Sequence, residues 1–310
     1  MNDEKNQQHK DRISDVASIQ PESAQAATAP ISHHRSHVTD HAPSLHDYKQ
    51  RARAQWSANP CGAHVAKDSD FGTREYFDAI EDYRYSVYAP WMKESISFDR
   101  YSGKRLLEVG FGTGTDLLQF ARGGASVTGV DITPRSIELA RRRFDLYALS
   151  GEFMIGDAEN LCFPDESFDV VYSFGVLHHT PDTERAIGEV HRVLRAGGEA
   201  VIMLYHRASL YYWGSIILKH GILGGDLFRE SPSEIMSRYV EHSETEGRPL
   251  VKAYTRGEAR RLFRDFSASE ISVNQLERSD LKLIGRLLPE SLFQRLARRF
   301  GWNLIIRAIK

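Results

Sequence analysis

The sequence predicts an α/β fold: a doubly wound sheet, mostly parallel with an antiparallel C-terminal strand, and helices on both faces. Between residues 104 and 205, short apolar runs alternate with amphipathic helical patterns. This alternation is typical of parallel strands joined by helical crossovers. Such crossovers are right-handed, which gives a doubly wound open sheet. A glycine-rich turn also follows the first apolar run, where sheets of this kind bind ligands.

Each element of this core has its own sequence pattern. The runs expected as strands are residues 104–109, 126–131, 152–155, 168–176 and 199–205. The helices expected between them are residues 115–123, 134–149 and 181–198.

Outside the core, Thr73 is a candidate cap for a helix over residues 74–92, and residues 55–62 with their Asn-Pro pair predict a turn. Thr255 and Glu258 stand in capping-box spacing and begin another helix. The remaining expected elements are a strand at 269–276, a helix at 289–300 and a strand at 302–310.

Changes of composition divide the chain into five segments. They are a disordered tail (1–46), a helical lid or substrate segment (47–100), a ligand-binding core (101–206), an apolar insert (207–254) and an end that completes the sheet (255–310). The tail cannot bury enough apolar surface to offset its ordering entropy. Its histidines include His33, His34, His37, His41 and His46, but no Cys or acid pair accompanies them, so it is either a plain solvated tail or a metal-binding one.

Bulk properties narrow the class of protein. A net charge of −2 argues against a dedicated nucleic-acid binder. The first residues lack the apolar stretch of a secretory signal, and no apolar run approaches the roughly 18 residues of a spanning helix. Two cysteines, Cys61 and Cys162, cannot build a disulfide framework and fit a reducing compartment. We therefore expect a cytoplasmic protein without a transmembrane segment.

The turn "VGFGTGTD" places Gly110, Gly112 and Gly114 between the first strand and the next helix. Glycines permit a tight turn that a ligand can approach, and the helix N-terminus directs free N–H groups at that ligand. Neither the G-x-G-x-x-G fingerprint of dinucleotide sites nor the Lys-Ser/Thr of a phosphate loop is present. Asp131 ends the second strand about 20 residues past the turn, the usual offset of a carboxylate that binds ribose hydroxyls.

Glu108 indicates which nucleotide fits this turn. Two unit charges about 4 Å apart interact by roughly 4 kcal/mol at an effective dielectric of 20. Glu108 would therefore repel a pyrophosphate and attract an ammonium group. The turn favours a ligand with a cationic group, a ribose and little phosphate, and S-adenosylmethionine has these features.

Four stretches in order resemble the motifs of a known family: "LLEVGFGTGTDL", "VTGVDIT", "GDAENLCFPDESFDVVYSFGVLHHTPD" and "RVLRAGGEAVIM". They are similar to the class I S-adenosylmethionine-dependent methyltransferases, which have a Rossmann-like sheet, in the branch that includes the ubiquinone and menaquinone methyltransferases. The resemblance implies S-adenosylmethionine as cofactor and methyl transfer as activity. Phe111 and Cys162 depart from the residues common at their positions, but neither is a predicted polar contact.

The resemblance also implies roles for single residues. The three glycines of the turn would make room for the methionyl part of the cofactor, with Glu108 beneath its amino end. Phe174 and Gly175 would line the floor near the sulfonium. The adenosine end would be held by Asp131 on the ribose, by Ile132 against the adenine, and by Asp157 on the adenine amino group with Ala158 alongside.

Methyl transfer is an in-line displacement that depends mainly on positioning, which contributes roughly 7–11 kcal/mol. A general base is needed only for a hydroxyl or a protonated amine. The candidates are His178 and His179, just past the fourth strand, and Tyr205 with His206 at the end of the fifth. Each has a packing role as its alternative. Adjacent histidines without ligands at metal spacing predict no metal site.

The acceptor is expected to be a small and hydrophobic molecule. The apolar stretch 210–225 either lines its pocket or forms a helix pair packed on the domain. An aromatic set is either a lid over the acceptor or a core-facing helix face: Tyr83, Tyr85, Tyr88 and Trp91.

The basic end of the chain, residues 282–310, is either a solvated helix face or a contact for an anionic membrane surface or RNA. An RNA methyltransferase of the same fold, and a protein that binds the cofactor without catalysis, are the alternative functions. The near-neutral charge argues against the first, and the intact glycine turn against the second.

Overall fold

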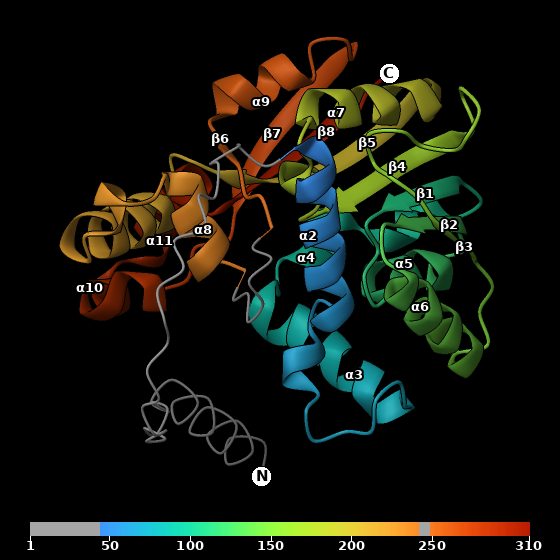
Figure 1. Cartoon of the computed structure of the whole chain (residues 1–310), viewed down its shortest axis with the longest axis horizontal. Helices are drawn as coiled ribbons and strands as arrows, with labels where there is room; N and C mark the ends of the chain where they lie inside the picture. Colours follow the sequence, from blue (N-terminus) through green and yellow to red (C-terminus); the bar gives the residue numbers. More distant parts are fainter. Residues whose placement is uncertain (1–43, 242–248) are drawn as a thin grey trace, which may run out of the picture. The chain divides into compact units, whose positions relative to one another are not determined.

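A mixed sheet of eight strands organises the computed structural model, which describes residues 44–241 and 249–310 (Figure 1). The strand order is β3-β2-β1-β4-β5-β8-β7, and the short β6 pairs with β5. The strands are β1 (Arg105–Val109), β2 (Ser126–Asp131), β3 (Glu152–Ile155), β4 (Phe168–Phe174), β5 (Leu194–His206), β6 (Ala253–Tyr254), β7 (Ala268–Asn274) and β8 (Asn303–Ile309).

The sheet has the predicted direction pattern. Strands β1 to β6 pair in parallel, whereas β8 is antiparallel to both of its neighbours, β5 and β7. The last strand of the chain is therefore inserted between two strands that precede it. The predicted fold class, mostly parallel with an antiparallel C-terminal strand, is confirmed.

Helices cover both faces because successive strand residues point to opposite sides. Leu106 packs in a core with α5 (Thr115–Arg122) and α6 (Pro134–Leu146), whereas Leu107 packs in a second core with α7 (Thr183–Val193) and α9 (Arg256–Leu262). The expected caps are present: Thr73 accepts a hydrogen bond from the Tyr76 amide, and Thr255 and Glu258 form a capping box.

The prediction of a helix through residue 198 is wrong at its C-terminal end. Helix α7 ends at Val193, and Gly197 and Gly198 lie within β5. The register of β5 against β4 shifts from Leu194 opposite Phe168 to Glu199 opposite Val170, so the intervening residues form a bulge. Gly197 adopts φ +70°, which suits a bulge and explains why glycines stand inside a strand.

The N-terminal segment is more helical than expected. Helix α2 (Leu45–Ala58) extends through residues predicted as tail and turn, and a turn follows only from Asn59. The rest of the predicted tail, including His33, His34, His37 and His41, lies outside the described residues. A short η1 (Ala63–Val65) leads to α3 (Arg74–Asp82).

The single helix predicted over 74–92 is interrupted. After α3 the backbone widens into the π-helical segment η2 (Tyr83–Tyr88), and Pro90 separates it from α4 (Met92–Ile96). Proline lacks an amide hydrogen and disfavours a helical residue before it, which accounts for the break.

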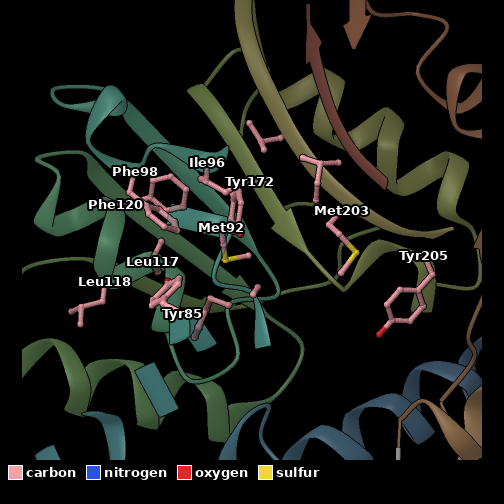
Figure 2. Close-up of a cluster of buried hydrophobic side chains, with 14 of the residues drawn as sticks. Tyr85, Met92, Ile96, Phe98, Leu117, Leu118, Phe120, Tyr172, Met203 and Tyr205 are labelled. Carbon is pink, nitrogen blue, oxygen red and sulfur yellow. The ribbon is translucent and has the colours of Figure 1, made fainter. Parts of the chain in front are cut away.

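The same segment supplies much of the core on one face of the sheet. Figure 2 shows Tyr85, Met92, Ile96 and Phe98 gathered with side chains of α5 and β4. Phe98 begins η3 (Phe98–Tyr101), and its ring lies 4.8 Å from that of Phe120. Tyr85 is therefore a core residue, whereas Tyr83, Tyr88 and Trp91 keep exposed surface.

The apolar insert forms helical structure beyond β5. It contains the π-helical η5 (Tyr212–Leu223), η6 (Asp226–Phe228) and α8 (Pro232–Tyr239). The chain then returns through β6, α9 and β7 to η7 (Ser279–Leu281), α10 (Lys282–Leu287) and α11 (Glu290–Phe300). In the described part of the chain, no helix is both long enough and apolar enough to cross a membrane.

Candidate functional site

The glycine turn at the carboxyl end of β1 has a conformation that requires glycine. Gly110, Gly112 and Gly114 have φ values of +77°, +54° and +73°, a region that other residues avoid. The Gly110 amide donates to the Val130 carbonyl at 2.7 Å and ties the turn to β2. A Cβ at Gly110 would come within 2.3 Å of Val176, whereas one at Gly112 would meet only Cys61, 3.7 Å away. The turn thus packs tightly on one side and leaves room on the other.

Phe111, the departure from the usual family residue, is accommodated by a second glycine. Its ring is buried and lies 5.8 Å from that of Phe153. A Cβ on Gly129 of β2 would approach the Phe111 ring to 2.5 Å. The larger side chain therefore occupies space that Gly129 leaves in the core.

Glu108 lies in β1 just before the turn and is 3% exposed. Its Oε2 has no hydrogen-bond partner among the described residues. Burial, reinforced by the nearby Asp116, raises the pKa of Glu108 well above its ordinary value, against the opposing effect of Arg84. A buried carboxylate with an unpaired oxygen is costly, and a cationic or hydrogen-bonding ligand would relieve that cost.

Asp116, in the first turn of α5, is in the opposite situation. It accepts hydrogen bonds from Arg84 Nε (2.9 Å), the Tyr85 hydroxyl (2.7 Å) and the Tyr172 hydroxyl (2.8 Å). Burial would raise its pKa, but Arg84 and the two phenols hold the pKa of Asp116 below its ordinary value. This network joins η2 to β4 and α5, and sequence analysis did not identify it.

Asp131 connects the end of β2 to the glycine turn. Its Oδ2 accepts the Gly112 amide at 3.0 Å, and its Oδ1 accepts both the amide and the hydroxyl of Thr133 at 2.9 Å. Burial raises the pKa of Asp131 although these hydrogen bonds oppose the shift. Ile132 follows it and is half-buried. The structure therefore holds the predicted ribose carboxylate directly beside the predicted methionyl turn.

Asp157 and Ala158 lie after β3, one strand further from the turn, and α2 packs over them. Lys49 of α2 forms ion pairs with Asp157 at 2.6 Å and with Glu159 at 2.5 Å. The Asp157 side chain keeps 35% of its surface exposed, and Ala158 is half-buried. Lys49 was missed because it falls in the region assigned to an acceptor lid rather than to the adenine end.

Phe174 and Gly175 stand at the carboxyl end of β4, and both are half-buried. The Arg84 guanidinium lies 4.5 Å above the Phe174 ring, and the Trp91 ring lies 6.2 Å from it. Gly175 has φ +77°, and a Cβ there would meet only Met203, at 3.5 Å. The end of β4 is thus lined by η2 and by a glycine that leaves space.

The two histidines after β4 occupy different environments. His178 is 0% exposed, and neither ring nitrogen has a well-formed hydrogen bond with the described residues. Its ring stacks on Tyr205, with centroids 3.9 Å apart, and burial lowers the pKa of His178 well below its ordinary value. Such a residue has no surface with which to meet an acceptor.

His179 instead joins a polar group with Tyr205 and Glu241. Its Nδ1 lies 2.7 Å from the Leu250 carbonyl, which leaves Nε2 facing Glu241 Oε1 at 3.5 Å. The Tyr205 hydroxyl donates to the same Glu241 oxygen at 3.0 Å. Burial and the charge of Glu241 raise the pKa of Tyr205 well above its ordinary value. Glu241 follows α8, in the predicted apolar insert, where nothing in the sequence pattern marked an acid.

His206, the further candidate, is not part of this group. Its Nδ1 lies 2.9 Å from the Gly301 carbonyl, and the residue is buried against the chain that enters β8. In the described part of the chain, no group of three or more His, Cys, Asp or Glu side chains is arranged to hold a metal ion.

Cys61 links the two halves of the site. A Cβ on Gly112 would lie 3.7 Å from the Cys61 side chain. Cys61 keeps part of its surface exposed to solvent. Burial raises the pKa of Cys61, and the charges that act on its thiol include Arg84, Glu241 and Asp131. The glycine turn and the His179 group therefore lie within electrostatic reach of one side chain.

Residues 107–202, from β1 into β5, match the family described as "methyltransferase domain". We refer to these residues as the methyltransferase domain, after the family that they match. It contains the glycine turn and the candidate residues from Glu108 to His179, whereas α2, η2 and the segment after β5 lie outside it.

The curated relatives match about a third of this chain. The phthiotriol/phenolphthiotriol dimycocerosates methyltransferase of Mycobacterium leprae is 50% identical over 99 residues, 31% of this chain and 36% of that protein. The phosphatidylethanolamine N-methyltransferase of Cereibacter sphaeroides is 40% identical over 103 residues, 33% of this chain and 50% of that protein. The chain spans between about a third and a half of the length of these relatives.

Among solved structures, a SAM-dependent methyltransferase of Thermotoga maritima is 20% identical. The match covers 74% of this chain and 98% of that one, with a TM-score of 0.44.

Proposed function

We propose that this chain transfers a methyl group from S-adenosylmethionine to a hydrophobic, lipid-like acceptor. The observation that carries the proposal is Glu108, a buried carboxylate with an unpaired oxygen beside a glycine turn that leaves space. A phosphate-rich cofactor would be repelled there, whereas the cationic end of S-adenosylmethionine would supply the missing partner.

The site residues fit that cofactor along its length. Glu108 would face its amino end across Gly110, Gly112 and Gly114. Arg84, held over Phe174 by Asp116, is suited to receive its carboxylate. The bound sulfonium supplies an activated methyl group, and the half-buried Phe174 and Gly175 would exclude water from that end.

At the adenosine end, Asp131 would accept the ribose hydroxyls through the lone pairs its backbone donors leave free. Ile132 and Ala158 would pack against the base. Asp157, which is paired with Lys49, would accept a hydrogen bond from the adenine amino group.

His179 is the residue we assign to proton removal from the acceptor. The contact of Nδ1 with the Leu250 carbonyl fixes the ring and leaves Nε2 as the basic nitrogen. Glu241 beside it would stabilise the imidazolium that forms, and Tyr205 holds Glu241 in place. A base of this kind serves acceptors that must lose a proton, which are hydroxyls and protonated amines, and of these two we propose a hydroxyl. His178 has a packing role in this proposal.

The acceptor pocket would be formed by described segments outside the methyltransferase domain, which are residues 47–100, 207–241 and 249–254. Aromatic side chains surround the His179 group: Trp56 lies 5.7 Å from His179, and Trp302 stacks on Tyr205 with centroids 4.5 Å apart. Relatives whose names specify lipid acceptors support the same class of substrate.

The test is incubation of the protein with methyl-labelled S-adenosylmethionine and a lipid extract, followed by mass analysis of the labelled product. We expect label in an apolar methyl ether. His179→Gln should lower the rate and remove the ionisation of a base from the pH profile, while cofactor affinity stays unchanged. Equal transfer to small polar amines would contradict the acceptor class, and an unchanged pH profile would contradict the base.

A further inference from the structure

The segment after β5 exposes large apolar side chains on one pair of helical elements. In η5, Trp213 is 58% exposed and Leu223 is 76% exposed, and in η6 Phe228 is 89% exposed. Leu227 of η6 packs directly on Gly221 of η5, because a Cβ on Gly221 would lie only 2.7 Å from Leu227 Cδ1. This contact holds the two elements together. Single exposed apolar residues are common, but several on neighbouring turns mark a contact surface.

A second exposed surface, formed by α10 and α11, is basic. Arg286, Arg295, Arg298 and Arg299 are all exposed, and none forms an ion pair with the described residues. The acid on the same helix, Glu290, is paired with Arg278. Two leucines lie among these arginines: Leu287, at 83% exposure, and Leu292, at 43%.

The arginines surround a depression of about 670 Å³. It is lined by Arg256, Arg295, Arg298 and Arg299 together with Ser291 and Gln294, and no acidic side chain contributes. Four guanidinium groups around one hollow attract an anion, and their planar donors match phosphate oxygens.

The buried Trp302, which follows α11, links the basic helices to the start of the apolar segment. The Tyr211 ring, one residue before η5, lies 5.0 Å from the Trp302 ring, and Asp280 of η7 acts on the Tyr211 hydroxyl. Figure 1 shows α8, α10 and α11 on the same side of the sheet, beyond the ends of β7 and β8. Acids on the apolar side are neutralised as well, because Asp226 is paired with Arg238.

We propose that η5–η6 and α10–α11 form a docking face for an anionic phospholipid bilayer. The aromatic and aliphatic side chains would enter the interfacial layer, while the arginines bind lipid phosphates. The charge of the face carries this choice: Arg286, Arg295, Arg298 and Arg299 form no ion pair with the described residues, whereas Glu290 and Asp226 are paired. This excess of positive charge complements a negative surface and not a second copy of the same face. The proposal goes beyond methyl transfer, since the face lies outside the methyltransferase domain.

The experiment is sedimentation of the full chain with vesicles, without cofactor or acceptor. We expect binding to vesicles of phosphatidylcholine mixed with phosphatidylglycerol, and little binding to phosphatidylcholine alone. Trp213→Ala with Phe228→Ala, and separately Arg295→Gln with Arg298→Gln and Arg299→Gln, should each weaken binding about tenfold or more. The arginine variant should also lose the sensitivity of binding to salt.

Matched controls lie elsewhere on the surface. Ile155 is 53% exposed on β3, at the opposite edge of the sheet, and the Arg264 side chain is 63% exposed after α9. Ile155→Ala and Arg264→Gln should bind vesicles as the unaltered protein does. All variants should keep the affinity for S-adenosylmethionine, which separates this proposal from the function above.

Equal binding to neutral and anionic vesicles would overturn the proposal, as would variants of the face that bind like the controls. Light scattering tests whether a second copy of this chain binds to the face instead. A wild-type dimer that dissociates in the Trp213→Ala, Phe228→Ala variant would show that it does, and would overturn the proposal.

Discussion

Two buried carboxylates eight positions apart differ in almost every respect. Asp116, at the start of α5, accepts hydrogen bonds from an arginine and two tyrosines. Glu108, at the end of β1, has an oxygen without a partner, and the pKa values of the two groups move in opposite directions. The protein therefore completes the environment of one carboxylate and leaves the other with an unpaired oxygen, where we propose that the cofactor binds.

The contrast separates structural from binding groups on physical grounds. A buried charge whose partners come from three different elements joins those elements and contributes to the fold. A buried acid whose partners are incomplete weakens the fold and is favourable only when something binds. Substitutions of each kind of group test this distinction.

Asp116→Asn is expected to have the largest effect. It leaves Arg84 buried without its counter-charge, which typically costs 3–5 kcal/mol. Chemical denaturation should show a loss of free energy of unfolding of about this size. The double variant Arg84→Met, Asp116→Leu removes both charges and should recover a large part of the loss. A single variant as stable as the wild type would show that the network is not structural.

Glu108→Gln should change stability and binding in opposite directions. The folded-state pKa of Glu108 is raised above that of the unfolded chain. The stability it contributes is therefore complete below its ordinary pKa and is lost as the pH rises through the raised value. The glutamine variant, which cannot ionise, should melt higher than the wild type in alkaline buffer and equally in acid. Thermal melts across pH test this, with the exposed Glu152→Gln on β3 as the control.

Asp131→Ala tests the adenosine end. It removes charge-assisted hydrogen bonds and should weaken S-adenosylmethionine binding by about 1–3 kcal/mol in calorimetry. The substitution also removes the acceptor of the Gly112 amide, so Asp131→Asn, which keeps a carbonyl oxygen, is the control. Unchanged affinity in both variants would remove the ribose assignment.

Lys49→Met should have the smallest effect. Its ammonium lies between Asp157 and Glu159 with 27% of its side chain exposed, and pairs of that kind contribute about 1 kcal/mol or less. We expect a small loss of thermal stability and a change in cofactor affinity well below that of Asp131→Ala. A loss of affinity as large as that of Asp131→Ala would contradict this expectation and would show that Lys49 of α2 is needed at the adenine end.

Much of the fold could be predicted because local signals and the sheet agree. The glycines at 110, 112 and 114 mark a backbone conformation that few residues adopt, and β2 and β3 coincide with their apolar runs. The Gly197–Gly198 pair was misread, because a glycine pair ends a helix as readily as it forms a bulge, and only pairing with β4 and β8 decides between the two.

The partners of the site residues could not be predicted in the same way. Lys49 reaches Asp157 across 108 positions, and Arg84 reaches Asp116 across 32, so no local pattern reports either contact. Glu241 meets Tyr205 only because the chain returns from α8 to the end of β5. Contacts of this kind depend on the packing of segments that the family motifs do not include.

The most direct test of the account is calorimetry of S-adenosylmethionine binding in buffers of different ionisation enthalpy. Because burial raises the pKa of free Glu108 and a cationic ligand would lower it, binding should release protons and tighten as the pH rises. Glu108→Gln should bind more weakly and show no proton release from this site. Binding of the wild type without proton release, with the same affinity in Glu108→Gln, would contradict the claim that this carboxylate receives the cationic end of the cofactor.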